Sequence, residues 1–352
     1  MSANCHNPQS NTMSVRGSST SGRGSGTLGG GGGGRGLGSS APRRRRHEPD
    51  WSSLSSPTSL LSFGLEIAGF GKERQRCRKE LSVQRFRAHY GVSDKATAHL
   101  IEDLRKHQPE EVVEVTLLLM GVYWLKVYTT EEVMAGRWGY DEKYCREHSR
   151  KYVLRIAALK PVKITLRGLD PRCKYVPVDG VHVRTQEFRC DPSSSWWSVK
   201  HNGPGVGLEV CCDPTNKGRI LHATRAAPAG VHDLTRFRGG KKNDKKNWKK
   251  DSLYFKLPDG VKAVGDSGYA GQPDKVVVTT EAHAAATKQL FARMKSMQET
   301  CFKRMKHFNV LSTTFRHGAG TSDKLQKVGD AFDAIAVLTQ HDIEHGHPLF
   351  KV

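Results

Sequence analysis

The sequence predicts an α/β domain that follows a helical segment and a low-complexity tail. Residues 1–60 are rich in Gly and Ser, and residues 72–160 carry the periodicity of helices. From about residue 161, short β-rich runs alternate with turn residues and longer helical patterns. Strands interspersed with helices in this order are typical of a sheet covered by helices.

Length and charge set the first limits. The chain has 352 residues, which allows two or three domains with a buried core. Its 56 Lys and Arg exceed its 35 Asp and Glu, giving a net charge of +21, which favours a polyanionic partner, most simply nucleic acid. The longest apolar stretch, residues 115–125, is shorter than the ~20 residues that a membrane helix needs, so no membrane role is expected.

The tail, residues 1–65, is expected to be disordered, because so polar and Gly-rich a segment buries too little apolar surface to offset its ordering entropy. The basic run 43–46 is typical of a nuclear import signal or a DNA contact, and equally of a solvated charge run. The eight cysteines form no C-x-x-C pair, and the polar start differs from a secretory signal. We therefore expect a reduced, intracellular protein, located in the nucleus.

Residues 72–160 are expected to be mostly helical. One helix carries Phe86 and Tyr90, and a Gly91-Val-Ser turn leads to a second helix capped by Ser93 or Asp94. Further along, Thr129 and Glu132 form a capping-box pattern at the start of a helix over 131–135.

A short Gly136-Arg-Trp-Gly turn then leads to a longer helix over 141–159, which completes a helix-turn-helix pattern. Lys143, Arg146 and Arg150 on the second helix suit contacts with DNA phosphates. Any helical hairpin with a basic outer face would give the same pattern, so both interpretations stay open here.

The remainder is expected to form a sheet with helices. Extended segments are predicted over 174–185, 196–199, 208–212 and 219–225, then a short helix over 231–237, strands over 261–265 and 276–280, and a helix over 281–308. The last helix has an apolar stripe made of Leu290, Met294, Met297, Cys301, Met305 and Phe308. This order of elements predicts an α/β sheet layered by helices.

Three carboxylates stand in contexts that suit a metal-dependent nuclease. Asp179 closes the run Tyr175-Val-Pro-Val-Asp-Gly, Asp266 closes a second extended run, and Glu299 lies within the long helix. Two carboxylates at strand ends and one on a helix can converge to bind divalent metal through oxygen. Alternatively, both Asp residues are turn residues before glycine or serine, and Glu299 is an exposed partner of Lys295 and Lys303.

Residues 173–352 resemble the catalytic domain of Harbinger-type DDE transposases. The matching segments are Val178-Asp-Gly-Val-His-Val-Arg, Gly230-Val-His-Asp, Gly265-Asp-Ser-Gly-Tyr, and Glu299 with Arg304 and Lys306 behind it. The preceding helical region also resembles the N-terminal part of this family. The resemblance implies a ribonuclease-H-like mixed sheet flanked by helices over 165–352, preceded by an all-α helix-turn-helix domain over 72–160 and the disordered tail.

The resemblance also implies catalysis by Asp179, Asp266 and Glu299, with Asp179 bridging two Mg²⁺ (or Mn²⁺) ions and the other two carboxylates holding one each. The activity implied is cutting, and rejoining, of DNA at transposon terminal repeats, by a homo-oligomer that uses a separate DNA-binding partner protein. Related bacterial transposases carry a Tyr-x2-Arg-x3-Glu-x6-Lys signature. Here Glu299 and Lys306 keep its end, whereas Ala292 and Lys295 replace Tyr and Arg.

Further residues are predicted to contact DNA. Arg304 and Lys306 would bind phosphate, and Lys245 and Lys246 belong to a basic loop that adds sequence-independent, salt-dependent affinity. Trp248 in the same loop would stack on an unpaired base, although a solvated, disordered loop explains the composition equally well. Asp233 is predicted either to support the metal ligands from behind or to be a helix N-cap, and the cap is favoured.

Two other functions are weighed against the endonuclease. One is a domesticated DNA-binding protein without cleavage activity, which has no need of all three carboxylates. The other is a zinc protease, because His341-Asp-Ile-Glu-His345 fits the H-x-x-E-H pattern. That chemistry needs a third ligand downstream, and only seven residues follow His345, so a C-terminal amphipathic helix is expected instead.

Overall fold

The computed structural model describes residues 54, 56–71, 78–186, 194–350 and 352. Most of the predicted disordered tail lies outside these residues. Its end is an exception, because α1 (Pro57–Ile67) is a helix whose buried Leu60, Leu61 and Leu65 contribute to the core. The Ser56 hydroxyl caps this helix by accepting from the Ser59 N–H. The predicted tail therefore ends earlier than residue 65.

Among the described residues between 78 and 163 the regular elements are all helices, as predicted for residues 72–160. They are α3 (Lys79–Tyr90), α4 (Asp94–His107), α5 (Val115–Val127), α6 (Glu131–Trp138), α7 (Glu142–Ala157) and α8 (Lys160–Lys163). Gly91 ends α3 in the left-handed conformation, with φ of 80°, and the Ser93 hydroxyl caps α4 by accepting from the Ala96 N–H. No helix in the described ranges is both long and apolar enough to cross a membrane.

The predicted pair of helices around Gly136 is present, with two corrections. Thr130, not Thr129, caps α6 by accepting from the Val133 N–H, and α6 continues through Gly136 to end before Gly139, where φ is 69°. Asp141 then caps α7, accepting from the Tyr144 N–H at 2.8 Å. The function of this hairpin in DNA binding stays a prediction.

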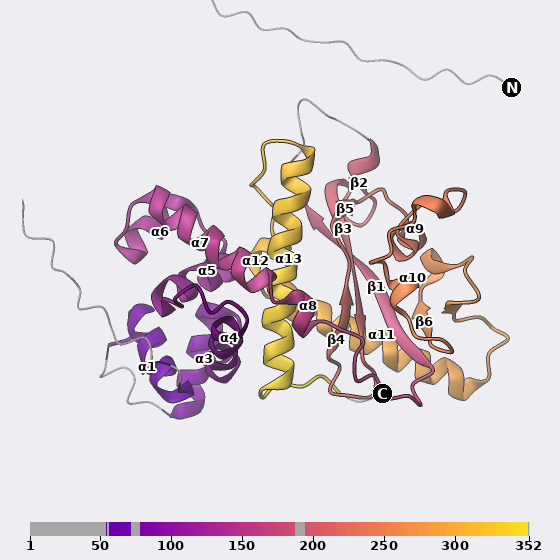
Figure 1. The fold of residues 1–352 in the computed structure, drawn as a ribbon, viewed down its shortest axis with the longest axis horizontal. Coiled ribbons are helices and arrows are strands. Elements are labelled where there is room, and N and C mark those ends of the chain that lie inside the picture. The colour runs from indigo at the N-terminus through magenta and orange to yellow at the C-terminus, as the bar shows by residue number, and fades with distance from the viewer. Residues whose placement is uncertain (1–53, 55, 72–77, 187–193, 351) are drawn as a thin grey trace, which may run out of the picture. The chain divides into compact units, whose positions relative to one another are not determined.

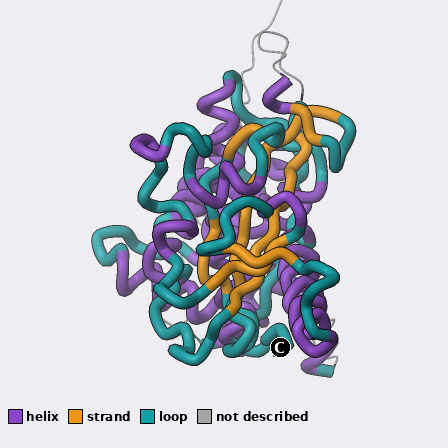
Figure 2. Tube along the Cα trace, turned by 90° about the vertical axis from the view of Figure 1, so that its right-hand side faces the viewer, coloured by secondary structure: helices purple, strands orange, loops and turns teal. Residues whose placement is uncertain are grey.

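A mixed sheet follows. Its strands are β1 (Tyr175–Arg184), β2 (Trp197–Ser198), β3 (Gly203–Cys212), β4 (Ile220–Ala223), β5 (Ala227–Pro228), β6 (Lys262–Gly265) and β7 (Val276–Val278). The strand order is β2-β3-β1-β6-β7, and β4 and β5 also pair with β3. β1 runs antiparallel to β3 and parallel to β6, which runs parallel to β7. Figure 2 shows the strands gathered together, with helices and loops around them. This arrangement is compatible with a ribonuclease-H-like fold.

Helices cover the sheet on both faces. On one face, Val183 and Val210 belong to the same buried cluster as Met297 and Cys301 of α11 (Ala285–Lys306). On the other face, Val176 and Val178 pack with residues of α9 (Asp233–Arg238), α10 (Leu253–Lys256) and the turn η4 (Ser267–Tyr269). Successive residues of β1 thus alternate between two apolar environments, as a strand between two layers requires.

The last long helix, α13 (Thr321–Glu344), joins the two parts of the described chain. It contacts α4, α7 and α8 on one side and β4 on the other, and it follows the short α12 (Asn309–Ser312) (Figure 1). Residues 334–337 are fully buried, as expected for a helix with neighbours all around. One hydrophobic cluster therefore runs from α1 to α13, and the boundary predicted between residues 160 and 165 falls within it.

We predict that the cap of α6 can be tested by paired substitutions. Thr130→Ala removes the hydroxyl that accepts from Val133 and should lower the free energy of unfolding by about 1 kcal/mol. Thr129→Ala serves as the matched control, because only the backbone carbonyl of Thr129 makes a hydrogen bond here, with Arg316. Thermal melting of both variants gives the comparison, and equal melting temperatures would place the cap elsewhere.

Candidate active site

Asp179 and Asp266 lie on adjacent parallel strands. Pro177 of β1 forms the last pair of this ladder with Val264 of β6, and Asp179 and Asp266 each lie two residues beyond that pair. Asp266 directly follows β6, as predicted, and its carboxylate accepts from the Gly268 N–H at 2.9 Å. Asp179, by contrast, lies in the middle of β1 and not at a strand end, because β1 continues to Arg184 in its pairing with β3.

The electrostatics show that these carboxyl groups influence one another. The pKa of Asp179 is raised to about 6, mainly by burial and in smaller part by the negative charges of Asp266 and Asp233. The Lys200 ammonium and the Gly180 N–H act in the opposite direction. Lys200 is held there because its Nζ donates to the Gly180 carbonyl at 2.9 Å. Asp179 therefore lies among like charges, with one cation nearby.

Glu299 lies on α11, on the face of the sheet that this helix covers. The preceding residue, Gln298, is buried and donates from Nε2 to the carbonyl of Val210 at 3.1 Å. Val210 is the residue of β3 that pairs with Asp179, so the helix is anchored beside that strand position. Glu299 itself is exposed, next to this anchor. Convergence of all three carboxyl groups on shared metals stays a prediction.

A fourth carboxylate, Asp233, belongs to the same region, although it was predicted to be a helix cap. That prediction is wrong, because His232 caps α9 through its Nδ1, and Asp233 accepts from Arg236 Nη1 at 2.7 Å. A Cβ at Gly180 would lie 2.7 Å from Asp233 Oδ1. A Cβ at Gly268 would lie 3.0 Å from oxygens of both Asp233 and Asp266. Because Gly180 and Gly268 have no side chains, the Asp233 carboxylate can lie close to the backbone at both positions.

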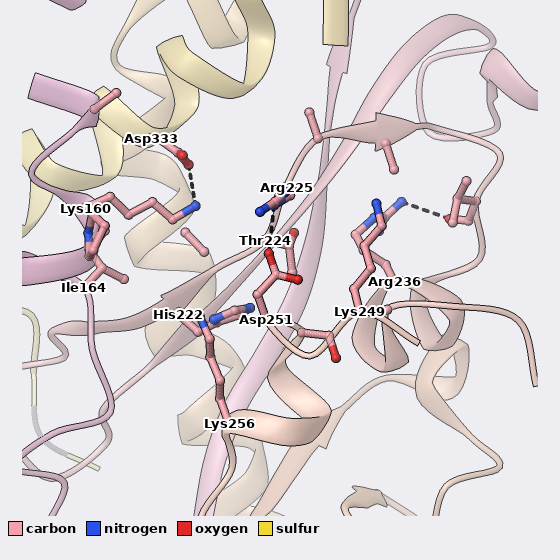
Figure 3. A pocket seen from close by; sticks show the side chains of 18 of the residues that line it. Lys160, Ile164, His222, Thr224, Arg225, Arg236, Lys249, Asp251, Lys256 and Asp333 are labelled. Atoms are coloured by element: carbon pink, nitrogen blue, oxygen red, sulfur yellow. Dashed lines mark hydrogen bonds and ion pairs between the residues drawn. The ribbon is translucent and has the colours of Figure 1, made fainter. Parts of the chain in front are cut away.

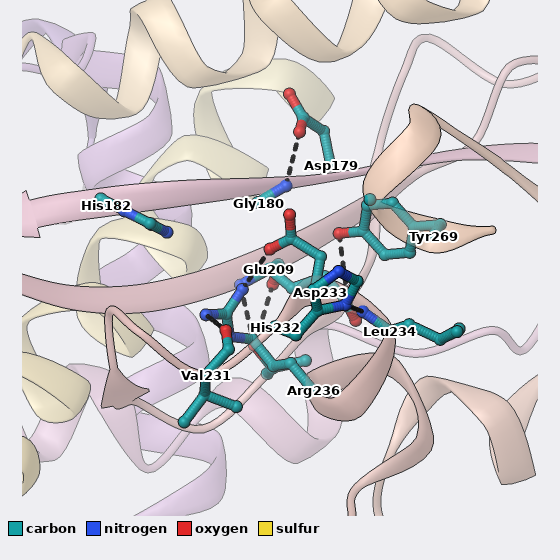
Figure 4. A network of polar contacts seen from close by, with 12 residues as sticks. Asp179, Gly180, His182, Glu209, Val231, His232, Asp233, Leu234, Arg236 and Tyr269 are labelled. Carbon is teal, nitrogen blue, oxygen red and sulfur yellow. Dashed lines mark hydrogen bonds and ion pairs between the residues drawn. The ribbon is translucent and has the colours of Figure 1, made fainter. Parts of the chain in front are cut away.

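A buried polar network lies on the opposite side of β1 from the Asp179 side chain (Figure 4). Its centre is Glu209 of β3, which is fully buried and accepts from the Tyr269 hydroxyl at 3.1 Å. Burial raises the pKa of Glu209 to about 8, with Arg236 opposing the shift, so the carboxyl is protonated near neutral pH. The sequence signal for this network is a Glu within the otherwise apolar β3, and Glu209 is not among the site residues predicted above.

The donor set fits a hard divalent cation. Asp179 on β1 and Asp266 directly after the neighbouring β6 both offer carboxylate oxygens, which Mg²⁺ and Mn²⁺ prefer. The raised pKa of Asp179 reports the cost of holding a negative charge there, and a bound cation would offset that cost.

The residues predicted to contact DNA fall into two groups. Lys143, Lys245, Lys246 and Lys306 are exposed, and Arg146 pairs with Glu131 on the surface. Arg150 is bound to Asp330 of α13, and Arg304 donates to the carbonyls of His347 and Pro348. Arg150 and Arg304 thus contribute to internal packing in this structure.

Trp248 requires a correction. Its side chain is only 5% exposed, and its indole Nε1 donates to the Lys241 carbonyl at 2.7 Å. The ring packs edge-to-face on Tyr254, with centroids 5.1 Å apart. No ring face is available for a base, and Trp248 instead supports the basic loop from within.

A basic pocket of about 560 Å³ lies between α8, β4 and α9 (Figure 3). Its cations are Lys160, Arg225, Arg236, Lys249 and Lys256. Its acids are already paired, Asp333 with Lys160 and Asp251 with Arg225, each at 2.7 Å. Burial, together with Lys256 and Lys160, lowers the pKa of the adjacent His222 to about 3. The pocket therefore has an excess of positive charge and suits an anionic ligand.

Comparisons with known proteins give little further guidance. The sequence matches no protein family, and no curated protein is significantly similar to it. Among solved structures, the chain shows similarity to the "Crystal structure of a pre-cleavage Mos1 transpososome", with 11% identity over 82% of this chain and 95% of that one. The TM-score of 0.21 marks a weak structural neighbour and is too low to establish a common fold.

The raised pKa of Asp179 predicts how stability depends on pH. An unfolded Asp ionises near its ordinary value of 3.8, whereas folded Asp179 ionises at about 6. The folded state of the metal-free protein should therefore lose roughly 2–3 kcal/mol from this group as pH rises through that window. Asp179→Asn carries no such charge, so at pH 7 it should melt at a higher temperature than the wild type.

Melting temperatures in the presence of a chelator, from about pH 4 to pH 8, give the test. Only the difference between wild type and variant is interpreted, because Glu209 and other groups titrate in both proteins. Asp259→Asn, at a fully exposed position, is the matched control and should follow the wild type. Parallel curves for wild type and Asp179→Asn would contradict the prediction.

Proposed function

We propose that this protein is a DDE-type endonuclease with a ribonuclease-H-like catalytic domain, which cuts DNA phosphodiester bonds with the help of divalent metal. The observation that supports the proposal is the parallel pairing of β1 with β6, since Asp179 and Asp266 each lie two residues beyond its last pair, Pro177 with Val264. The anchor of α11 beside the same position of the sheet supports Glu299 as the third carboxylate. The resemblance of residues 173–352 to Harbinger-type transposases supports the same three residues.

In this proposal Asp179 contributes to the binding of two Mg²⁺ or Mn²⁺ ions, and Asp266 and Glu299 each hold one. Such ions lower the pKa of an attacking water or 3′-hydroxyl and stabilise the leaving oxygen. The chain itself positions the carboxylates. Arg236 holds Asp233 next to Asp266, and Lys200 places a cation close to Asp179, where it can also contact a DNA phosphate.

The DNA would be bound mainly through lysines. Sequence-independent contacts with phosphates are offered by the exposed Lys143, Lys245, Lys246 and Lys306. The basic pocket of Figure 3 adds Lys249, close in sequence to Lys245 and Lys246. We propose transposon terminal repeats as the substrate, a homo-oligomer as the active form, a separate DNA-binding partner protein and a nuclear location. These four points rest on the family resemblance and on the basic run 43–46.

A second candidate is a DNA-binding protein without nuclease activity. The charge of +21 and the basic pocket support DNA binding independently of the three carboxylates. The exposed position of Glu299 is the observation that favours this candidate. Cleavage assays separate the two.

DNA binding is predicted to be salt-dependent and independent of the carboxylates. Asp179→Asn should keep the affinity of the wild type, and for about six phosphate contacts that affinity should fall roughly 10³-fold between about 50 and about 200 mM salt. The double variant Lys245→Glu and Lys246→Glu should bind more weakly and with a shallower salt dependence. Titrations of labelled duplex at several salt concentrations provide the measurement, and an affinity insensitive to salt would contradict a nucleic-acid partner.

Cleavage is predicted to require divalent metal and each of three carboxylates. Asp179→Asn, Asp266→Asn and Glu299→Gln keep the shape of the side chain and remove its charge. Each should slow single-turnover nicking of terminal-repeat DNA by roughly a thousandfold or more, since several kcal/mol of transition-state stabilisation is lost. The exposed Asp259→Asn is the matched control and should nick like the wild type.

The assay must include any required partner protein, with Mg²⁺ and Mn²⁺ tested separately. Nicking by wild type and equally by Asp266→Asn would show that the assignment of the carboxylates is wrong. Tight, salt-dependent binding by a wild type that never nicks would instead establish the second candidate. His345→Ala should nick normally, which separates the nuclease from a zinc protease.

A further inference from the structure

The C-terminal end of α13 carries a group of potential metal ligands that the proposed nuclease does not use. One ligand atom from each of His341, Glu344 and His345 lies within 4.8 Å of the others. His341 is fully buried, and neither of its ring nitrogens has a hydrogen-bond partner among the described residues. An imidazole without a partner in the interior is costly, and coordination to a metal would satisfy one of its nitrogens.

A further candidate ligand, outside the three residues whose ligand atoms all lie within 4.8 Å of one another, is on α4. The Asp103 carboxylate places Oδ2 3.5 Å from Nε2 of His341. This distance is too long for a good hydrogen bond between these atoms. It is close to the separation of about 3.3–3.4 Å between two ligands of a tetrahedral Zn²⁺ whose bonds measure about 2.0–2.1 Å.

The ring of His345 is also held in place. It stacks on His99 of α4 with centroids 3.6 Å apart, and His99 Nδ1 lies 2.9 Å from Glu102 Oε2. Nε2 of His345 lies 3.8 Å from Glu344 Oε2. The two helices thus present two imidazoles and two carboxylates to the same small region.

The local charge favours a cation. Glu102, Asp103 and Glu344 contribute three negative charges, and Lys163 contributes one positive charge, bonded to Asp103 at 3.1 Å and to Glu344 at 2.8 Å. The sum of −3 and +1 is −2, in a chain whose net charge is +21. A carboxylate oxygen has more than one lone pair, so both acids can bind a metal and keep Lys163.

We propose that His341, His345, Asp103 and Glu344 form a structural Zn²⁺ site that ties α4 to α13. Imidazole nitrogen among the donors favours Zn²⁺ over Mg²⁺. Four protein ligands close the coordination sphere, which is the arrangement of structural and not catalytic zinc sites. The H-x-x-E-H pattern is therefore explained without a protease, since the ligand sought downstream of His345 is supplied upstream by Asp103.

The test uses the full-length protein, stripped of metal with a chelator and titrated with Zn²⁺ and with Co²⁺ as a spectroscopic probe. We expect one equivalent to bind, with the visible absorption of four-coordinate Co²⁺, and to remain bound in a large excess of Mg²⁺. Zn²⁺ should also raise the melting temperature, because it binds only the folded state. His345→Ala and Asp103→Asn, at partly exposed positions, should lose both the Co²⁺ absorption and the thermal shift.

His107→Ala provides the matched control, because His107 is exposed on the last turn of the same helix as Asp103 and should leave metal binding unchanged. Far-UV circular dichroism of the metal-free variants confirms that they are folded. The proposal is overturned if the wild type binds no stoichiometric Co²⁺, or if both ligand variants keep the absorption. Nicking of DNA by His345→Ala in Mg²⁺ is measured in a separate assay. Failure of the Zn²⁺ proposal and failure of the nuclease proposal are therefore distinguishable.

Discussion

The parallel pairing of β1 with β6 is the constraint on which the candidate site depends. Parallel neighbours align residues that are distant in sequence, and here Asp179 and Asp266 each lie two residues beyond the last pair of the ladder, Pro177 with Val264. A shift of one residue would turn one of these side chains to the opposite face. The helix α11 uses the same register, because Gln298 binds the carbonyl opposite Asp179. Any function that combines these carboxylates therefore depends on correct pairing of two short strands.

The same arrangement has a cost in stability. Asp179 is largely buried among like charges, and Glu209 lies fully buried in the neighbouring strand with one carboxyl oxygen that has no hydrogen-bond partner among the described residues. Arg236 offsets part of this cost, since its guanidinium binds Asp233 and the Val231 carbonyl while also lining the basic pocket. A protein selected for stability alone has no reason to collect acids in this way. Perturbed carboxyl groups concentrated in one region are typical of functional sites.

Much of the fold could be predicted from the sequence, because local residue patterns determine the type and order of its elements. Alternation and helical periodicity predicted the order of strands and helices, and the apolar stripe of α11 is buried except for Leu290, which is half-buried. What failed depended on side-chain contacts that periodicity does not report, whether the partners are near in the chain or far from it. Trp248 looked like an exposed aromatic in a basic loop, yet Lys241 and Tyr254 enclose it. Asp233 looked like a cap, but the residue directly before it, His232, caps α9, and Asp233 binds Arg236 instead. The third ligand near His341 was missed for the same reason, since Asp103 is on another helix.

The position of α13 also changes the interpretation of the helix-turn-helix pattern. A recognition helix must expose the residues that enter a groove, and those lie near its N-terminal end. The second half of α7 cannot do so, because Tyr152, Val153 and Ile156 are buried and Arg150 is bound to α13. The first turns remain open, with Lys143 and Arg146 on the surface. If α7 contacts DNA, it does so through this end alone, because the rest of the helix packs against α13, which also contacts β4 of the sheet.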